Sequence, residues 1–332
     1  MASFEESGPS TPVTEGIRVD KVSPRSRRLK RIRSLVVVLI ALIGLIPVAV
    51  MVITAFKSRT EVVAVPPRLI FEPTLEGFVF LLTERSQMAP AILEEAKQNA
   101  GELGLFDRIA LNAGQQITGP SDFVRRLRNS LIIAGGSTIF TVALGLFAAY
   151  AFSRFEVPGK GDLMFLILST RMLPAVVVAV PLFLMFRQLN LYDTHLGMII
   201  LYTVFNLSLT TWLLKGFMDE IPKEYEEAAM VDGYSRWQAF YKIVIPQAST
   251  GIAATTVFAF IFAWNEYALA LMMTSETART APPAIATMQG RGGIEWSAIA
   301  AGTLAFLIPV IIVAFALRKH LLRGVTFGAI RQ

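Results

Sequence analysis

The chain has 332 residues, of which 54% are hydrophobic and 17% are charged, and its mean hydropathy is +0.55. These values exclude an ordinary soluble domain and indicate an integral membrane protein. The formal net charge is +6, and the absence of cysteine excludes disulfides, thiolate metal sites and cysteine catalysis.

Six apolar runs have the length of about 20 residues that a helix needs to cross a bilayer. They lie at about 34–56, 129–152, 163–187, 196–215, 251–274 and 298–317. The polar leader 1–33 is expected to be largely disordered. No small-residue cleavage signal follows the first run, so we expect a retained anchor. The pattern predicts an all-α membrane protein with six transmembrane helices.

Lysine and arginine counts predict the topology, because cytoplasmic segments retain positive charge. Eighteen such residues lie in the leader, in the tail 318–332 and in the connections 153–162 and 215–247, against two in the short connections of the other side. Both termini are therefore expected in the cytoplasm. The basic balance reflects this topology and does not suggest nucleic acid as a partner.

The first outer segment, 57–128, is too long for a simple connection between two spans. Pro90 is expected to open a helix there and Gly101 to close it. We expect a small external subdomain, which is either a packing embellishment or a docking surface for another protein.

Prolines and small residues mark the transmembrane core, 129–317. Pro174 and Pro181 in the third span, and Pro47 in the first span outside this core, are expected to kink their helices, which indicates either a pathway or simple packing. Small residues after position 133 favour close approach of helices. Trp264 and Trp296 are expected near membrane boundaries as aromatic anchors.

Ionisable and amide side chains inside the spans form a second group of candidates, because buried polar groups in a membrane usually face a cavity or each other. The candidates are Arg171, Asn206, Asn265 and Glu266. Either some of these side chains line a polar cavity for a hydroxyl-rich solute, or Arg171 and Glu266 form a structural pair that holds helices together. His195, at the end of a span, is expected to be an interface residue.

The cytoplasmic connection 216–247 is predicted to form two short helices. Pro222 suits a first helical turn, and three glutamates follow at the positive end of the helix dipole. Gly233 is the expected C-terminal stop, because glycine adopts positive φ without a Cβ penalty. Ser235 and Gln238 fit a capping box that starts the second helix.

The second short helix carries an apolar face and ends at Pro246. That face consists of Trp237, Phe240, Tyr241 and Val244. From these residues alone, the helix pair is either a surface feature or a rigid lever that carries the movement of a cytoplasmic partner into the membrane. A DNA-binding helix-turn-helix is disfavoured, since the first helix is acidic and spans flank the pair.

The spacing Glu227-Ala228-Ala229, three residues, Gly233, nine residues, then Ile243-x-Ile245-Pro246 resembles the EAA loop of permease subunits of ATP-binding-cassette importers, with Ile245 where Leu is usual. The stretches "AAYAFSRFEVPGK" and "FIFAWNEYALAL" look like the carbohydrate branch and its MalG-like permease. The long outer segment goes beyond compact members of that branch.

The resemblance implies a type I importer permease fold and a membrane subunit of an importer for a sugar or polyol, in the bacterial inner membrane. It implies a MalF-like second permease, a MalK-like ATPase dimer that binds ATP and Mg, and an external solute-binding protein, with no cofactor in this chain. The coupling residues it implies are Glu227, Ala228, Ala229, Asp232, Gly233, Ile243 and Pro246.

The main alternative is a secondary transporter for a small polar solute, although the few acidic residues within the spans offer little for ion coupling. An enzyme is disfavoured. The sequence has no GxxxxGK[ST] phosphate loop, no HExxH and no GxSxG sequence. Which sugar or polyol is carried does not follow from the sequence.

Overall fold

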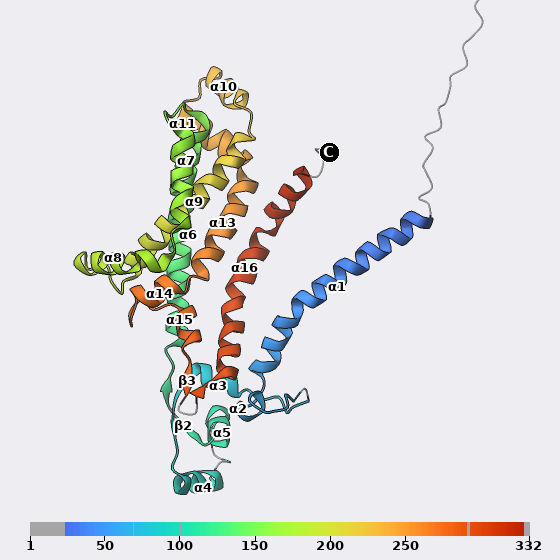
Figure 1. Ribbon diagram of the computed structural model, residues 1–332, viewed down its shortest axis with the longest axis vertical. Helices are drawn as coiled ribbons and strands as arrows, with labels where there is room; N and C mark the ends of the chain where they lie inside the picture. The colour runs from blue at the N-terminus through green and yellow to red at the C-terminus, as the bar shows by residue number, and fades with distance from the viewer. Residues whose placement is uncertain (1–23, 69, 100, 102, 291–292, 329–332) are drawn as a thin grey trace, which may run out of the picture. The chain divides into compact units, whose positions relative to one another are not determined.

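The computed structural model is almost entirely helical, with two small two-stranded antiparallel sheets (Figure 1). It describes residues 24–328 apart from 69, 100, 102 and 291–292, with side chains from Ile32 to Arg318. The chain divides into two compact units, Met1–Val50 and Met51–Gln332.

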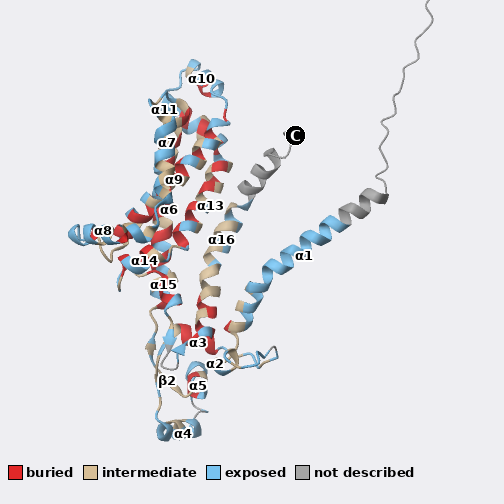
Figure 2. Cartoon of the chain, viewed as in Figure 1, coloured by how far each residue is buried: buried red, intermediate tan, exposed pale blue. Residues whose placement is uncertain are grey.

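Helix α1 (Pro24–Ala55) makes up the described part of the first unit and continues into the second. It begins ten residues before the expected span, so the prediction of disorder is wrong for residues 24–33. Pro24 suits a first turn, and the Arg, Lys and Leu residues after it favour helix. The prediction for residues 1–23 lies outside the described part. Ile32–Ala55 is long and apolar enough to cross a membrane. In its most apolar window of 18 residues, no residue is buried (Figure 2).

Four helices form the framework of the second unit. They are α6 (Phe123–Arg154), α9 (His195–Asp219), α13 (Ser249–Trp264) and α16 (Trp296–Gly328). Helix α6 lies along α9, and α13 packs against α6, α9 and α16. Small residues permit this close approach, because a Cβ added at Gly145 of α6 would lie 2.7 Å from Thr210 of α9. The tail expected from 318 continues α16 as helix to Gly328.

Two of the six expected spans are not continuous helices. The run 163–187 is divided into α7 (Lys160–Ser169), the 3-10 turn η2 (Thr170–Met172) and α8 (Ala175–Gln188), with a bend of 91°. Pro174 explains the break, since a residue before proline disfavours the helical conformation, and Leu173 is extended. The kink expected there is therefore a complete interruption of the helix.

The fifth expected span, 251–274, also ends early. Helix α13 stops at Trp264, and α14 (Ala268–Met273) comes after a short break. At its other end, α13 meets the preceding helical segment Arg236–Gln247 at a bend of 74°. The described residues thus contain four helices able to cross a membrane, or up to six if each bent pair counts as one span.

Trp264 lies in the core, and the expectation of an anchor at the membrane boundary is wrong for this residue. It is 1% exposed, stacks on Phe306 with ring centroids 4.6 Å apart, and donates from Nε1 to the Phe306 carbonyl at 3.1 Å. The early end of α13 explains this position, because the indole then lies among helices. Trp296, at the start of α16, is half exposed.

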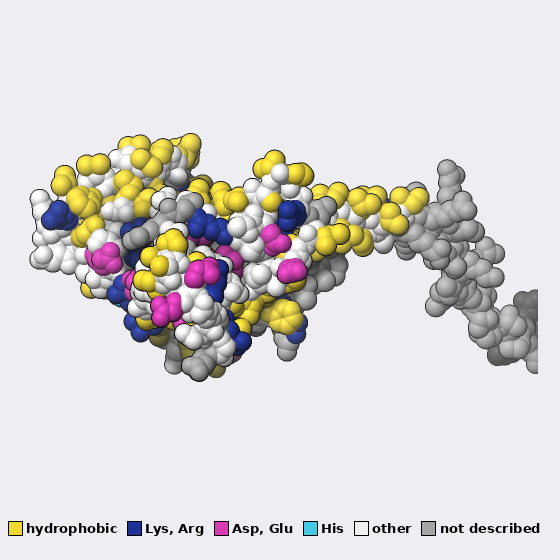
Figure 3. Space-filling view, turned by 90° about the horizontal axis from the view of Figure 1, so that it is seen from below, with side chains coloured by type: hydrophobic (Ala, Val, Ile, Leu, Met, Phe, Trp, Pro, Cys, Tyr) yellow, Lys and Arg dark blue, Asp and Glu magenta, His cyan; other side chains and the backbone are white. Residues whose placement is uncertain are grey.

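The segment expected to be external, which we continue to call the external segment, folds into short elements at the lower end of Figure 1. They are α2 (Arg59–Val62), α3 (Glu76–Leu82), β1 (Thr83–Gln87), α4 (Pro90–Gln98), α5 (Leu105–Asn112) and β2 (Gln115–Pro120). Strands β1 and β2 pair antiparallel. Pro90 opens α4 as predicted, but the helix ends at Gln98, before Gly101. In Figure 3 acidic and basic side chains are interspersed on this face.

A second group of short elements lies between α14 and α16. It contains α15 (Ala281–Ala286) and the small hairpin of β3 (Gln289–Gly290) and β4 (Gly293–Ile294). Close packing joins α3 to the start of α16, because a Cβ added at Gly77 would lie 2.6 Å from the Ser297 carbonyl oxygen. The external segment is therefore part of the second unit.

Asp193 fixes the turn between α8 and α9 to the connection after α14. Its carboxylate accepts four backbone N–H bonds of 2.9–3.1 Å from residues 275–278. Burial alone would raise the pKa of Asp193, but the four N–H donors outweigh it and lower the pKa below its usual value. Next to this turn, His195 Nε2 lies 2.8 Å from Asn129 Oδ1, so His195 joins α9 to α6.

Candidate functional site

The connection between α9 and α13 forms the two short helices that the sequence predicts, at the upper end of Figure 1. Helix α10 (Glu224–Val231) begins two residues after Pro222. Gly233 ends it with φ of +90°, and Tyr234 N–H bonds the Ala229 carbonyl at 3.0 Å, the pattern of a Schellman motif. The tight glycine turn fixes the angle between α10 and the second short helix.

The second short helix starts at the predicted capping box. Ser235 Oγ accepts from Gln238 N–H at 3.2 Å, and Gln238 Oε1 accepts from Ser235 N–H at 2.8 Å. Helix α11 (Arg236–Ala239) continues into the π-helical turn η3 (Phe240–Val244) and α12 (Ile245–Gln247). Pro246 lies in the first turn of α12 and does not end the helix as expected. The chain bends two residues later instead.

The predicted apolar face of this helix is divided between core and surface. Phe240 and Val244 are buried among residues of α6 and α9, whereas Trp237 and Tyr241 are more than 60% exposed. Phe240 lies 4.5 Å from Tyr150 of α6 between ring centroids. The buried half anchors the loop to the transmembrane helices, and the exposed half is free to contact another molecule.

Glu226 is a functional candidate that our sequence reasoning missed. Its side chain is buried, and it accepts a hydrogen bond from the Tyr150 hydroxyl at 2.8 Å and an ion-paired one from Arg154 Nε. Arg154 also donates to the Ile221 carbonyl at 3.0 Å. We call these four residues the Glu226 clamp. It joins α10 directly to the end of α6.

A signal for the clamp is present in the sequence, because Arg154 ends an apolar run and three glutamates open the loop. On sequence grounds, however, Glu226 is only one of three charges at a helix N-terminus. Which of the three turns inward depends on the angle of α10, and Pro222 and Gly233 set that angle in three dimensions. Glu224 and Glu227 are exposed.

The coupling residues predicted from the sequence lie on both sides of the loop. Glu227, Ala228, Asp232, Gly233 and Pro246 are exposed, Ala229 is 7% exposed, and Ile243 is half-buried. Around the exposed Ala228 lie the exposed side chains of Tyr225 and Val231. The result is a small, mostly apolar surface on α10 whose other side is held by the clamp.

Three of the four polar residues predicted for the spans surround one cavity. Arg171, Asn206 and Glu266 line a space of about 330 Å³, together with aromatic side chains that include Tyr202. Asn265 does not line it, and its side-chain N–H₂ group donates to the Ile261 carbonyl at 2.8 Å. The cavity lies where both expected spans break, because Arg171 is in η2 and Glu266 lies just after α13.

Arg171 and Glu266 do not form an ion pair within 4 Å in the described structure, which argues against the structural pair considered from sequence. The guanidinium of Arg171 lies over the Phe262 ring at 4.5 Å, and its Nη1 is buried without a hydrogen-bond partner. Glu266 Oε1 accepts from Leu269 N–H at 2.9 Å. Hydrogen-bonding capacity is therefore left over inside the cavity.

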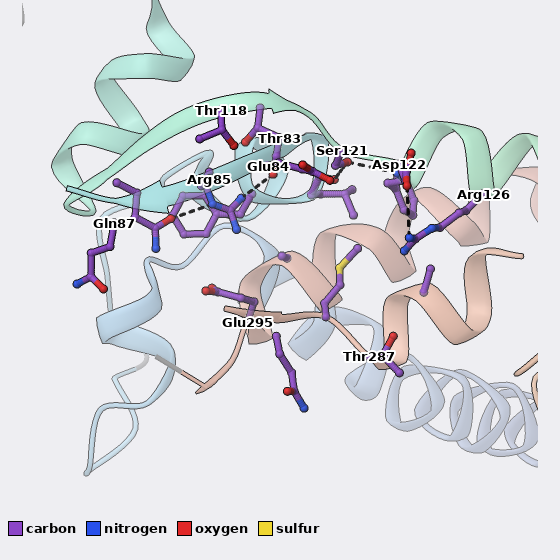
Figure 4. A pocket seen from close by; sticks show the side chains of 18 residues that line it. Thr83, Glu84, Arg85, Gln87, Thr118, Ser121, Asp122, Arg126, Thr287 and Glu295 are labelled. Atoms are coloured by element: carbon purple, nitrogen blue, oxygen red, sulfur yellow. Dashed lines mark hydrogen bonds and ion pairs between the residues drawn. The ribbon is translucent and has the colours of Figure 1, made fainter. Parts of the chain in front are cut away.

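A second polar cavity, of about 450 Å³, lies between the β1/β2 sheet and the start of α16 (Figure 4). Arg85 lies over the Phe80 ring at 3.7 Å and donates to Gln115 Oε1 at 2.8 Å. Burial lowers the pKa of Arg85, and buried Glu295 opposes this shift. Burial also raises the pKa of nearby Glu76. An ion pair of 3.5 Å between Arg59 and Glu295 links the external segment to the residue before α16.

Comparison with known proteins identifies the family. The model of the family described as "binding-protein-dependent transport system inner membrane component" matches residues 141–327. This chain belongs to that family. Its members are permease subunits of ATP-binding-cassette transporters and are non-catalytic. The match includes the whole loop from α9 to α13 and all the residues named above for the cavity at the helix breaks.

Individual relatives agree with this assignment. The chain is 32% identical to the probable ABC transporter permease protein y4oR of Sinorhizobium fredii over 85% of its own length and 88% of the relative. It is 39% identical to the trehalose transport system permease protein SugB of Mycobacterium tuberculosis, over 63% of this chain and 77% of that protein. The assignment decides against the secondary transporter.

A solved structure shows the same fold. A chain of a bacterial ABC transporter involved in the import of the acidic polysaccharide alginate superposes with a TM-score of 0.61 at 19% identity, over 90% of this chain and 98% of that one. The helical architecture is therefore shared with a chain of that transporter. The chain is a multi-pass membrane protein.

Proposed function

We propose that this chain is one of two permease subunits of an importer for a sugar or polyol in a bacterial inner membrane. Half of the pathway would come from this chain and half from a MalF-like partner. A MalK-like ATPase dimer would bind ATP and Mg, and an external protein would deliver the solute. The observation that carries the proposal is the loop between α9 and α13, whose one side is exposed and whose other side is fixed to α6.

The loop supports a mechanical role because its two sides have different surroundings. Ala228 is small and exposed, so a partner's surface can approach α10 closely, and Tyr225 and Val231 add apolar area beside it. Movement of α10 would be transmitted to α6 through the ion pair of Glu226 and Arg154. The exposed residues are thus the contact with the ATPase, and the clamp is the connection to the pathway.

Blocking the contact tests this role. Ala228→Trp adds a large side chain at an exposed position, so we expect normal membrane insertion but loss of co-purification with the ATPase subunit. Ala91→Trp, on exposed α4 of the external segment, is the matched control. Undiminished co-purification and solute-stimulated ATP hydrolysis in Ala228→Trp would contradict the proposal.

The topology in the proposal counts α7 and α8 as one span and keeps Arg236–Gln247 in the cytoplasmic connection, giving six spans with both termini in the cytoplasm. It can be tested with single cysteines, because the chain has none of its own. We expect Ser235→Cys to react with an impermeant maleimide only in inverted vesicles, and Ala91→Cys only in intact cells. The opposite labelling would refute the orientation.

The sugar or polyol class is supported by the name of the trehalose relative and by the cavity at the helix breaks. Planar donors and a carboxylate, such as those of Arg171, Asn206 and Glu266, suit hydroxyl groups. We expect Arg171→Gln to change the order of solute preference while the assembled complex forms normally, with Asn265→Ala, outside the cavity, as the control. Loss of the assembled complex in Arg171→Gln would instead indicate that Arg171 has a structural role in holding helices together.

A further inference from the structure

A groove lies between α7 and the C-terminal part of α9, on the same end of the bundle as the loop described above. Its volume is about 490 Å³. The apolar lining consists of Met164 on α7 and Trp212, Leu213 and Phe217 on α9. No residue of α7 is buried, so its packing against α9 is incomplete and leaves this space open.

Two glycines keep the groove open, one on each wall. Gly161 lies on α7 and Gly216 on α9, and a Cβ added at either position would meet no atom within 4 Å. The groove is therefore a space that the chain's own side chains leave unfilled, and larger residues could fill it without displacing the helices.

Charged residues gather at the rim, where the apolar part of α9 ends. Lys215 is not available to a ligand, because its ammonium forms an ion pair with Asp219. Asp219 also accepts a hydrogen bond from Ser153 at 2.6 Å. Lys160 and Glu220 also line the groove. Among the described residues, neither side chain has an ion pair within 4 Å or a hydrogen bond. Within the described part of the chain, the groove thus offers an ammonium, Lys160, whose charge also acts on Asp219 without a direct ion pair, and a carboxylate, Glu220, without a hydrogen bond or an ion pair.

The position suits a lipid headgroup. Trp212 is 49% exposed one turn before the charged end of α9, and tryptophan is enriched at the boundary between hydrocarbon and water. Met164, Leu213 and Phe217 provide apolar lining beside the charged residues, as an acyl chain requires. The four charges of Lys160, Lys215, Asp219 and Glu220 sum to zero, which favours a zwitterionic headgroup over an anionic one.

We propose that this groove binds phosphatidylethanolamine, with the phosphate against Lys160, the primary ammonium against Glu220 and an acyl chain along Met164 and Phe217. Phosphatidylcholine has the same charges, but its quaternary nitrogen has no N–H to donate to a carboxylate. Phosphatidylglycerol has no cation for Glu220. The inference depends only on the chain lying in a membrane and not on the solute that it carries.

The test uses the full chain in nanodiscs of equal phosphatidylethanolamine, phosphatidylcholine and phosphatidylglycerol with identical acyl chains, followed by native mass spectrometry of the lipids retained after transfer to detergent. We expect phosphatidylethanolamine to be retained about two- to five-fold over phosphatidylcholine, the size of effect expected for one interfacial ion pair. Equal retention of these two lipids, or preference for phosphatidylglycerol, would overturn the proposal.

Variants separate the headgroup contacts. Glu220→Gln should remove the preference for phosphatidylethanolamine over phosphatidylcholine, whereas Glu156→Gln, an exposed carboxylate at the same end but outside the groove, should keep it. Lys160→Gln should lower retention of all three lipids, and Lys160→Arg should restore it. An unchanged preference in Glu220→Gln would refute the assigned ammonium contact.

Filling the groove tests the site as a whole. Gly216→Leu should abolish the retained lipid at unchanged melting temperature, and Gly135→Leu, a glycine of α6 with open space around it, should have no effect. Retention in Gly216→Leu would place the lipid elsewhere. Cross-linking of a photoreactive residue at Met164 to a partner polypeptide, instead of lipid, in the assembled transporter would also contradict the proposal.

Discussion

The Glu226 clamp makes a quantitative prediction about the loop between α9 and α13. Glu226→Gln keeps the size of the side chain but leaves the Arg154 guanidinium buried without its counter-ion, since the side chains are 8% and 5% exposed. Removing one partner of a buried ion pair costs about 3 kcal/mol. Because the clamp joins α10 to α6, that cost should lower the free energy of opening of the loop rather than that of the whole bundle.

Amide hydrogen exchange in residues 224–233 measures this opening. A loss of about 3 kcal/mol corresponds to about 100-fold faster exchange, provided that the native loop is protected by at least that much. Glu227→Gln changes an exposed neighbour in the same helix and should leave exchange within about two-fold. The double variant Arg154→Met, Glu226→Leu removes both charges and should recover part of the protection.

The result that would refute this reasoning is specific. If Glu226→Gln and Glu227→Gln exchange alike, the ion pair does not hold the loop. If protection falls equally in α13, the pair stabilises the bundle as a whole and is not a local connection. In an assembled importer, Glu226→Gln should also weaken the stimulation of ATP hydrolysis by solute, because a loosened α10 transmits less movement to α6.

Three further predictions concern other contacts. The lowered pKa of Asp193 means that its contribution to stability is present above its unfolded-state pKa and is lost as pH falls through the folded-state pKa; Asp193→Asn should therefore lower the melting temperature at pH 7 and flatten its decline under acid. Gly251→Leu should prevent correct folding, as seen by loss of a monodisperse peak in size-exclusion chromatography, because even a Cβ there would collide with the Phe217 ring, whereas Gly135→Leu should not. Trp264→Phe should cost about 1 kcal/mol, the value of its hydrogen bond to the Phe306 carbonyl, measured as a lower denaturation midpoint.

Local sequence signals predict those parts of the molecule in which neighbours along the chain decide the structure. The capping box of Ser235 and Gln238 and the positive φ of Gly233 depend on a few adjacent residues, and both are present. The apolar runs likewise locate the helices, since twenty apolar residues in a row have few alternatives in a membrane.

Local sequence patterns do not predict features that depend on residues far apart in the chain. The apolar run continues to 274, yet the helix ends at Trp264, and the indole expected at a membrane boundary enters the core. Glu226 escapes prediction for the same reason, because its partners Tyr150 and Arg154 are more than 70 positions away in the chain. Apolar length alone reveals neither a break in a helix nor the side to which a charge turns.

The two breaks bear on how the central cavity is interpreted. Backbone that is not helical is tolerated at membrane depth only where it is buried in protein or lines a polar cavity, since unpaired amide groups in lipid cost several kcal/mol. Here η2 and the residues after α13 contribute Arg171 and Glu266 to the same cavity, and the two side chains do not pair with each other. A brace needs neither a cavity nor two broken helices. The solute pathway that we propose would use the cavity, because its polar groups must stay unpaired until the solute arrives.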